Sequence, residues 1–166
     1  MKRSYHLLIW PALSIVVLDQ ISKYIVLTNI EIHRSIPVIS GFFNLVHTRN
    51  RGMAFGMFNR PGSDLGYYLL LSATFVAVIL LLFWFSRLKQ EERILTPGLS
   101  LILGGAIGNL ADRIRLREVI DFLDFYIGPY HWPAFNVADS AITVGTFWVV
   151  LGLLFLIPKE SREGVK

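Results

Sequence analysis

Four long apolar stretches, each of about 20 residues, dominate the sequence and limit the folds open to it. They cover residues 7–27, 66–85, 94–112 and 137–157. A helix of about 20 apolar residues crosses a bilayer core about 30 Å thick. The chain has 166 residues, of which 54% are hydrophobic and only 17% charged, too little charged surface for a water-soluble domain of this size. We therefore expect an all-α membrane protein, a four-transmembrane-helix bundle forming a single domain.

Two of the connections between these stretches are long enough to hold structure of their own. They cover residues 28–65 and residues 113–136. In the first, the segment from Phe42 to Thr48 has the aromatic and β-branched composition of a strand. The segment 52–58 is apolar but broken by glycine, which is typical of a chain lying in the membrane interface. We expect a small β-containing loop on the face that the two connections share.

The distribution of basic residues bears on orientation and on partners. Four spans place both chain ends on one side of the membrane, and Lys and Arg are slightly more numerous there. This weak bias predicts cytoplasmic termini and extracytoplasmic loops. The net charge of +4 does not indicate a nucleic-acid-binding protein, because the basic residues form no stripe. Membrane lipid is the expected partner of these side chains.

The polar residues that a lipid-spanning helix should avoid all fall near the face of the two long loops. Ionisable groups at membrane depth cost several kcal/mol and usually mark a functional site. These residues are Asp19 and Lys23 in the first stretch, Asn109 and Asp112 at the end of the third, Asp121 in the loop that follows, and Asn136 and Asp139 at the start of the fourth.

Several of these residues also have a purely structural interpretation. Asp19 and Lys23 are four residues apart, so they share one helix face and can neutralise each other. Asp112 lies near a helix C-terminus, where the helix dipole disfavours an anion. It therefore requires a cation, and Arg113 or Arg115 is the expected partner.

Two aspartates suggest catalysis. Asn136 and Asp139 have the spacing of a helix-capping box, so Asp139 taken alone is explained as a cap. Asp121, in contrast, lies between Ile120 and Phe122, where a merely solvated aspartate needs no apolar neighbours. Two carboxyl groups close together in a poorly solvated site share a proton, so one can activate water while the other donates to the scissile carbonyl.

Other functions fit the sequence less well. The four histidines have no metal-ligand spacing and the chain has no cysteine, so we expect neither a metal nor a cofactor. A serine–lysine peptidase needs a serine beside Lys23, but Ser22 points away from it on a helix. A proton-coupled transporter needs a polar path to both faces, which the second and third stretches do not offer. A non-catalytic assembly factor, with the polar residues joining helices, stays open at this point.

Five separated motifs resemble those of the type II signal peptidases, the bacterial lipoprotein signal peptidases, which are intramembrane aspartyl peptidases. The similarity extends over nearly the whole chain and keeps the motifs in order. The motifs are Asp-Gln-Ile-Ser-Lys at 19–23, Asn-Arg-Gly-Met-Ala-Phe at 50–55, Gly-Ala-Ile-Gly-Asn-Leu-Ala-Asp-Arg at 105–113, Val-Ile-Asp-Phe at 119–122 and Phe-Asn-Val-Ala-Asp-Ser at 135–140.

The resemblance implies an aspartic endopeptidase that removes the signal peptide from diacylglyceryl-modified prolipoproteins, cleaving before the lipidated cysteine. It implies Asp121 and Asp139 as the catalytic dyad, residence in the bacterial inner membrane and an active site near the outer leaflet. We expect the protein to act as a monomer. The resemblance further implies a set of supporting and substrate-binding residues: Asn50, Gly52, Ala54, Asn109, Asp112, Arg113 and Asn136, with Asp19 and Lys23 bracing the first span.

Overall fold

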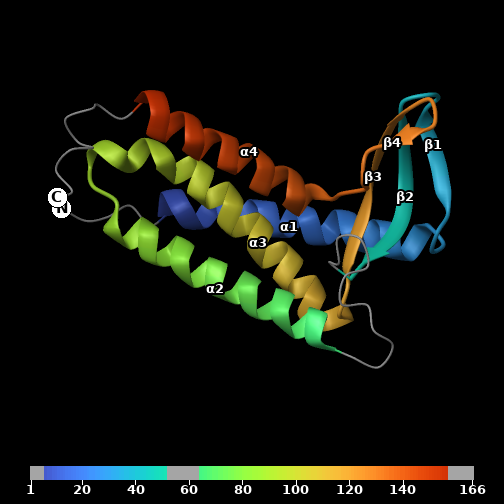
Figure 1. Ribbon diagram of the computed structural model, residues 1–166, viewed down its shortest axis with the longest axis horizontal. Helices are drawn as coiled ribbons and strands as arrows, with labels where there is room; N and C mark the ends of the chain where they lie inside the picture. The colour runs from blue at the N-terminus through green and yellow to red at the C-terminus, as the bar shows by residue number, and fades with distance from the viewer. Residues whose placement is uncertain (1–5, 52–63, 157–166) are drawn as a thin grey trace.

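The computed structural model describes residues 6–51 and 64–156 as four long helices with a small sheet at one end (Figure 1). A 3₁₀ turn, η2 (Glu91–Leu95), precedes α3, and a π-helical turn, η3 (Gly152–Leu156), extends α4. The helices are α1 (His6–Asn29), α2 (Leu65–Arg87), α3 (Thr96–Leu116) and α4 (Val137–Leu151).

All four helices are long and apolar enough to cross a membrane. In the span that contains α3, 61% of the most apolar window is buried inside the protein, against 6% for α2. The helix α3 therefore forms the centre of the bundle, and α1, α2 and α4 each pack against it. Most of the exposed surface of α2 is apolar, as expected of a helix that faces lipid.

Glycines on α3 allow its close packing against two neighbours. A Cβ atom at Gly104 would lie 2.6 Å from the carbonyl oxygen of Ala12 on α1. Gly108 also faces α1, whereas Gly105 faces α4 at Ala138. The spacing of Gly104 and Gly108 is typical of close helix contacts in membranes, and it serves such a contact here. This contact brings the polar residues of α1, α3 and α4 into one layer.

The sheet is antiparallel, with the strand order β1-β2-β3-β4. Its strands are β1 (Ser35–Ile39), β2 (Phe43–Asn50), β3 (Val119–Ile127) and β4 (Tyr130–His131). The strand expected near Phe42–Thr48 is confirmed as β2. The all-α class is corrected, because β2 pairs with β3 and so joins the two long loops into one four-stranded sheet.

The sheet is attached to α1 by a small apolar cluster. Val26 and Ile30 near the end of α1 pack with Ile120 and Phe122 of β3, and all four side chains are buried. Figure 1 shows the sheet at the end of the bundle where α1 and α3 finish and α2 and α4 begin. The beginning of α1 and the end of α4 lie at the opposite end. The polar residues singled out in the sequence therefore meet beside the sheet.

Candidate functional site

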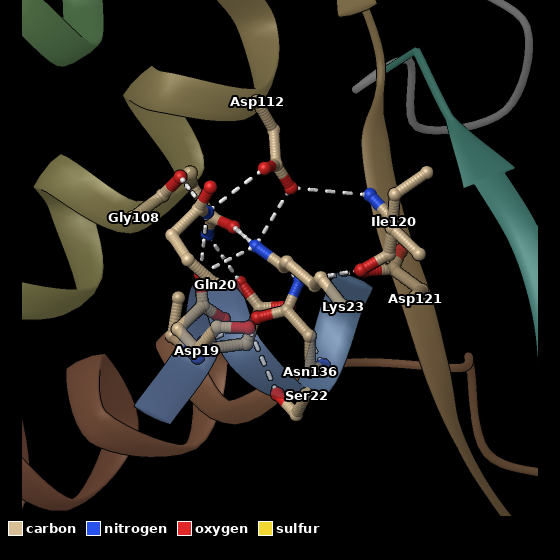
Figure 2. Close-up of polar contacts among 12 residues, drawn as sticks. Asp19, Gln20, Ser22, Lys23, Gly108, Asp112, Ile120, Asp121 and Asn136 are labelled. Atoms are coloured by element: carbon tan, nitrogen blue, oxygen red, sulfur yellow. Dashed lines mark hydrogen bonds and ion pairs between the residues drawn. The ribbon is translucent and has the colours of Figure 1, made fainter. Parts of the chain in front are cut away.

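A buried lysine holds together the first half of the site. The Lys23 ammonium lies 2.8 Å from a carboxylate oxygen of Asp19 and 2.8 Å from one of Asp112. It also donates to the side-chain oxygen of Asn109 at 3.0 Å. Lys23, Asp19 and Asp112 are 2%, 0% and 2% exposed, respectively. An ammonium has three N–H donors, and each of these finds an acceptor here (Figure 2).

The same cluster joins α1 to α3 and α4. The second carboxylate oxygen of Asp19 accepts a hydrogen bond from the Ala138 amide at the start of α4, at 2.9 Å. Gln20 donates to Asp112 at 2.9 Å and to the Gly108 carbonyl at 3.2 Å. We call Asp19, Gln20, Lys23 and Asp112 the lysine cluster. Its bonds fix the relative positions of the three helices that carry the remaining site residues.

The structure corrects the expected partner of Asp112. The sequence indicated Arg113 or Arg115, the nearest basic residues along the chain, but Asp112 pairs with Lys23 from another helix. Arg115 instead donates to the side-chain oxygen of Gln20, at 3.0 Å. Arg113 donates to the Asn109 carbonyl at 3.3 Å. The cation that neutralises Asp112 comes from α1 because the close α1–α3 contact places Lys23 beside it.

One asparagine joins the two aspartates suspected of catalysis. The Asn136 side-chain amide donates to Asp121 at 2.7 Å, and its oxygen accepts from the Asp139 backbone amide at 2.9 Å. The Asp139 carboxylate accepts in turn from the Asn136 backbone amide at 3.3 Å. The capping box expected from the sequence is thus present, and Asn136 is completely buried. Asn136 therefore both caps α4 and donates a hydrogen bond to Asp121.

Two further asparagines hold the outer oxygens of the aspartates. Asn109 donates to Asp139 at 2.8 Å, and Asn50 at the end of β2 donates to Asp121 at 2.9 Å. The side-chain oxygen of Asn109 accepts from both Lys23 and Asn136, at 3.0 and 3.3 Å. Asn109 therefore connects the lysine cluster to the aspartate pair.

The fold explains the position and the electrostatics of Asp121. It lies in β3 rather than in an irregular loop, between Ile120 and Phe122, which anchor the strand to α1. Burial raises the pKa of Asp121 to about 6, and the nearby negative charge of Asp139 adds to this rise. The hydrogen bonds from Asn50 and Asn136 act in the opposite direction, since they stabilise the ionised form.

Most of the residues selected from the sequence meet in this region. Arg113 is close enough to interact electrostatically with Asp139, Asp112 and Asp121. Gly52 and Ala54 lie outside the described residues. Sequence reasoning gave no role to Gln20, although a polar residue inside an apolar span next to Asp19 was the available signal. The residues brought together are Asp19, Lys23, Asn50, Asn109, Asp112, Asp121, Asn136 and Asp139.

The chemistry open to the site follows from its donor set. In the part of the chain that the structure describes, no three His, Asp or Glu side chains form a metal-ligand group. Two carboxyl groups that accept hydrogen bonds from amides can exchange a proton with water and with a bound carbonyl group. Four membrane-length helices with a buried polar site at one end define a class, the multi-pass membrane proteins with a polar site beside the end of the bundle.

The family follows from comparison with known proteins. Residues 11–155 match the family Signal peptidase (SPase) II, and the chain therefore belongs to this family of membrane proteases. The lipoprotein signal peptidase of Desulforapulum autotrophicum is 48% identical over 141 residues, which cover 85% of this chain and 87% of that one. The lipoprotein signal peptidase of Geobacter sulfurreducens is 42% identical over 163 residues, covering 98% and 99% of the two chains.

Solved structures show the same fold. One bacterial membrane enzyme superposes with a TM-score of 0.80 at 32% identity, covering 99% of this chain and 94% of the other. A second superposes with a TM-score of 0.81, also at 32% identity, covering 93% and 96%. The helices and the sheet described above are therefore arranged as in solved bacterial membrane enzymes.

Proposed function

We propose that this protein removes the signal peptide from diacylglyceryl-modified prolipoproteins, with Asp121 and Asp139 as its catalytic pair. Membership of the signal peptidase II family and the names of the relatives support the reaction and the substrate. The bond hydrolysed is the one before the lipidated cysteine.

The single observation that carries the catalytic assignment is the position of Asn136. It hydrogen-bonds to both aspartates and so keeps their carboxyl groups in one small, poorly solvated region. The nearest lysine, Lys23, already has three acceptors, and neither aspartate is among them. The pair thus has amide donors but no contacting lysine. Two such carboxyl groups retain a proton more readily than separated ones, as a dyad requires.

The two aspartates have different roles in this proposal. The raised pKa of Asp121, about 6, makes it the carboxyl group that carries the shared proton. Asp139 lies in the first turn of α4, where the Asn109 amide donates a hydrogen bond to its carboxylate. Asp139 takes a proton from water as the water oxygen attacks the scissile carbonyl carbon. Asp121 gives its proton to the carbonyl oxygen, so that a gem-diol forms. As the C–N bond breaks, Asp139 gives the proton taken from water to the leaving amine, and a hydroxyl group of the gem-diol returns its proton to Asp121.

Location follows from the chemistry of the substrate. Each CH₂ of an acyl chain withdrawn from the bilayer costs about 0.8 kcal/mol, so a diacylated substrate has to be cleaved at the membrane surface. We place the sheet outside the bacterial inner membrane, the chain ends in the cytoplasm and the site near the outer leaflet. Gly52 and Ala54 are assigned to substrate binding by their motif alone. We also propose that the enzyme acts as a monomer in contact with membrane lipid.

Cleavage of a lipidated precursor by purified enzyme tests the proposal. Wild type should release the signal peptide, whereas Asp121→Asn and Asp139→Asn should each lose at least about 10²- to 10⁴-fold in rate, the usual contribution of general acid–base catalysis. Full activity in either variant would remove that residue from the mechanism. Activity that depends on added zinc would contradict the metal-free reaction.

Membrane orientation can be measured separately because the chain has no cysteine of its own. Single cysteines can replace Tyr130 in β4 and Lys89 between α2 and η2. A membrane-impermeant thiol reagent applied to whole bacteria with a permeabilised outer membrane should label the cysteine at 130 and not the one at 89. The reverse pattern would invert the proposed orientation.

A further inference from the structure

One flank of α4 carries a strip of polar side chains that begins at Asp139 and continues into the membrane. Thr143 and Thr146 follow Asp139 at spacings of four and three residues, so the three side chains lie along the same side of the helix. Both threonines are exposed, while Asp139 is partly buried. Val137, at the start of α4, packs against the cluster formed by Val26 of α1, Ile30 and two residues of β3. The strip is therefore on the flank turned away from this cluster.

No helix of the described chain covers this strip. Gly145 on another side of α4 meets α3. The helix α2 packs chiefly against α3, and Figure 1 shows α2 and α4 on different sides of it. Exposed hydroxyl groups also occur at Ser14 and Thr28 on α1, but those on α4 continue the line of the Asp139 carboxyl group into the membrane.

We propose that Thr143 and Thr146 bind the main chain of the signal peptide just before the scissile bond. This inference rests on the proposed function and adds the substrate subsite to it. A signal peptide crossing the bilayer as a helix has every backbone N–H group paired. Hydrolysis requires extended chain at the scissile bond, so N–H groups next to it lose their partners inside the membrane. The enzyme has to supply acceptors for them.

The geometry of Thr143 makes its oxygen such an acceptor. Its hydroxyl group donates to the Asp139 carbonyl at 2.8 Å, which commits the only hydrogen of the group to its own helix. The lone pairs of the oxygen remain available, so this exposed group can only accept. Within the described chain, no hydrogen bond engages the hydroxyl group of Thr146. Both oxygens are thus available to peptide N–H donors.

The spacing of the strip matches an extended peptide. At 1.5 Å per helical residue, Thr143 and Thr146 lie about 6 and 10 Å deeper along α4 than Asp139. An extended chain advances about 3.3 Å per residue, so these depths correspond to roughly two and three residues before the cleaved bond. The signal peptide continues into the membrane in the same direction as α4. The strip therefore follows the path of the substrate away from the dyad.

Removal of one hydroxyl group at a time provides the first test. Thr143→Val should lower kcat/KM for a lipidated precursor about threefold to tenfold, the value of one hydrogen bond, and Thr146→Val should lower it by the same amount or less. Thr143→Ser should restore the rate. The matched control is Thr28→Val, because Thr28 is also exposed and bonds the carbonyl four residues earlier, but lies on α1. The control variant should cleave like wild type.

Substrates with an ester in place of one backbone amide provide a second test that leaves the enzyme unchanged. The ester removes an N–H donor at a chosen residue before the scissile bond. With the ester at the residue that faces Thr143, kcat/KM of wild type should be threefold to tenfold lower than with the all-amide substrate. The kcat/KM of Thr143→Val should not fall further when that ester replaces the amide. If every ester position lowers kcat/KM by the same factor in Thr143→Val as in wild type, the proposal is wrong.

The outcomes separate this inference from the function on which it rests. If wild type does not cleave the precursor, or Asp139→Asn cleaves it fully, the proposed function fails. If those experiments succeed but Thr143→Val and Thr146→Val behave like Thr28→Val, only the substrate subsite is wrong. The pH profile should stay unchanged in both threonine variants, since neither residue contacts the carboxyl group of Asp121 or Asp139.

Discussion

The lysine cluster and the aspartate pair lie side by side and use the same acidic residue type, yet their surroundings differ. Asp19 and Asp112 share one ammonium at 2.8 Å, and every N–H donor of Lys23 is used. Asp121 and Asp139 contact asparagine amides and backbone amides. An ion pair at contact distance holds both charges in place, whereas neutral amides leave the proton of a carboxyl group free to move.

This difference separates structural carboxylates from reactive ones within one buried region. Burial alone does not distinguish them, because Asp19, Asp112 and Asp121 are all nearly inaccessible. The partner decides. Asp19 and Asp112 each contact the Lys23 ammonium, while burial beside a second carboxylate raises the pKa of Asp121 to about 6. The lysine cluster should therefore control stability, and the aspartate pair should control the reaction.

The largest expected effect is the loss of Lys23. Lys23→Met leaves two buried carboxylates without a cation, which should lower the free energy of unfolding by about 3–5 kcal/mol. Chemical denaturation in detergent, followed by circular dichroism, measures this change. Arg34→Met is the control, since Arg34 forms an exposed pair with Glu31 at 4.0 Å and should cost less than about 1 kcal/mol. Equal effects of the two substitutions would remove the distinction between the lysine cluster and an ordinary surface pair.

Replacement of Asn136 should affect both properties, and a second variant separates them. Asn136→Ala removes the helix cap, which should lower the free energy of unfolding by about 1 kcal/mol. It also lets the two carboxyl groups move, which should lower kcat about 100-fold. Asn136→Ser keeps a side-chain acceptor for the Asp139 amide but has no amide donor for Asp121. It should recover the stability and not the rate. Recovery of both by serine would mean that Asn136 acts only as a cap.

The smallest expected effect is a shift in pH dependence. If Asp121 supplies the proton, kcat/KM falls as pH rises through its pKa of about 6. The bond from Asn50 lowers this pKa, so Asn50→Leu raises it and moves the alkaline limb of the profile to higher pH. Asn44→Leu is the matched control, because Asn44 donates to Asp124 on the same two strands, also at 2.9 Å. A limb that moves to lower pH in Asn50→Leu would contradict the role given to Asp121.

The sequence predicts the helices well and the sheet only in part. Long apolar stretches identify spanning helices because lipid demands that composition. The composition of the segment Phe42–Thr48 predicts a strand, whereas the composition of β3 does not. Val119–Ile127 contains two aspartates, and its pairing with β2, about 70 residues earlier in the chain, is a long-range contact that local composition does not encode. The position of Asp121 in a strand was missed for that reason.

The partners of the site residues show the same difference between contacts within one element and contacts between elements. The Asp19–Lys23 pair and the Asn136 cap follow from spacing along one helix, and both were predicted. The pairing of Lys23 with Asp112 depends on how closely α1 approaches α3, so the nearest arginines in the chain were the wrong choice. The bond from Asn136 to Asp121 likewise joins a helix to a strand. Contacts between elements required the three-dimensional structure.

The most direct measurement compares Asp121→Asn with Asp112→Asn, two isosteric changes at equally buried aspartates. Cleavage of a lipidated precursor and the free energy of unfolding at pH 7 are measured on both. We predict that Asp121→Asn abolishes cleavage without lowering the free energy of unfolding, because ionising this buried group above pH 6 costs the folded state energy that the amide avoids. The Asp112→Asn variant should lose more than about 1 kcal/mol of unfolding free energy and should still cleave the precursor. The opposite result, with cleavage retained in Asp121→Asn and stability unchanged in Asp112→Asn, would contradict the division between the two regions.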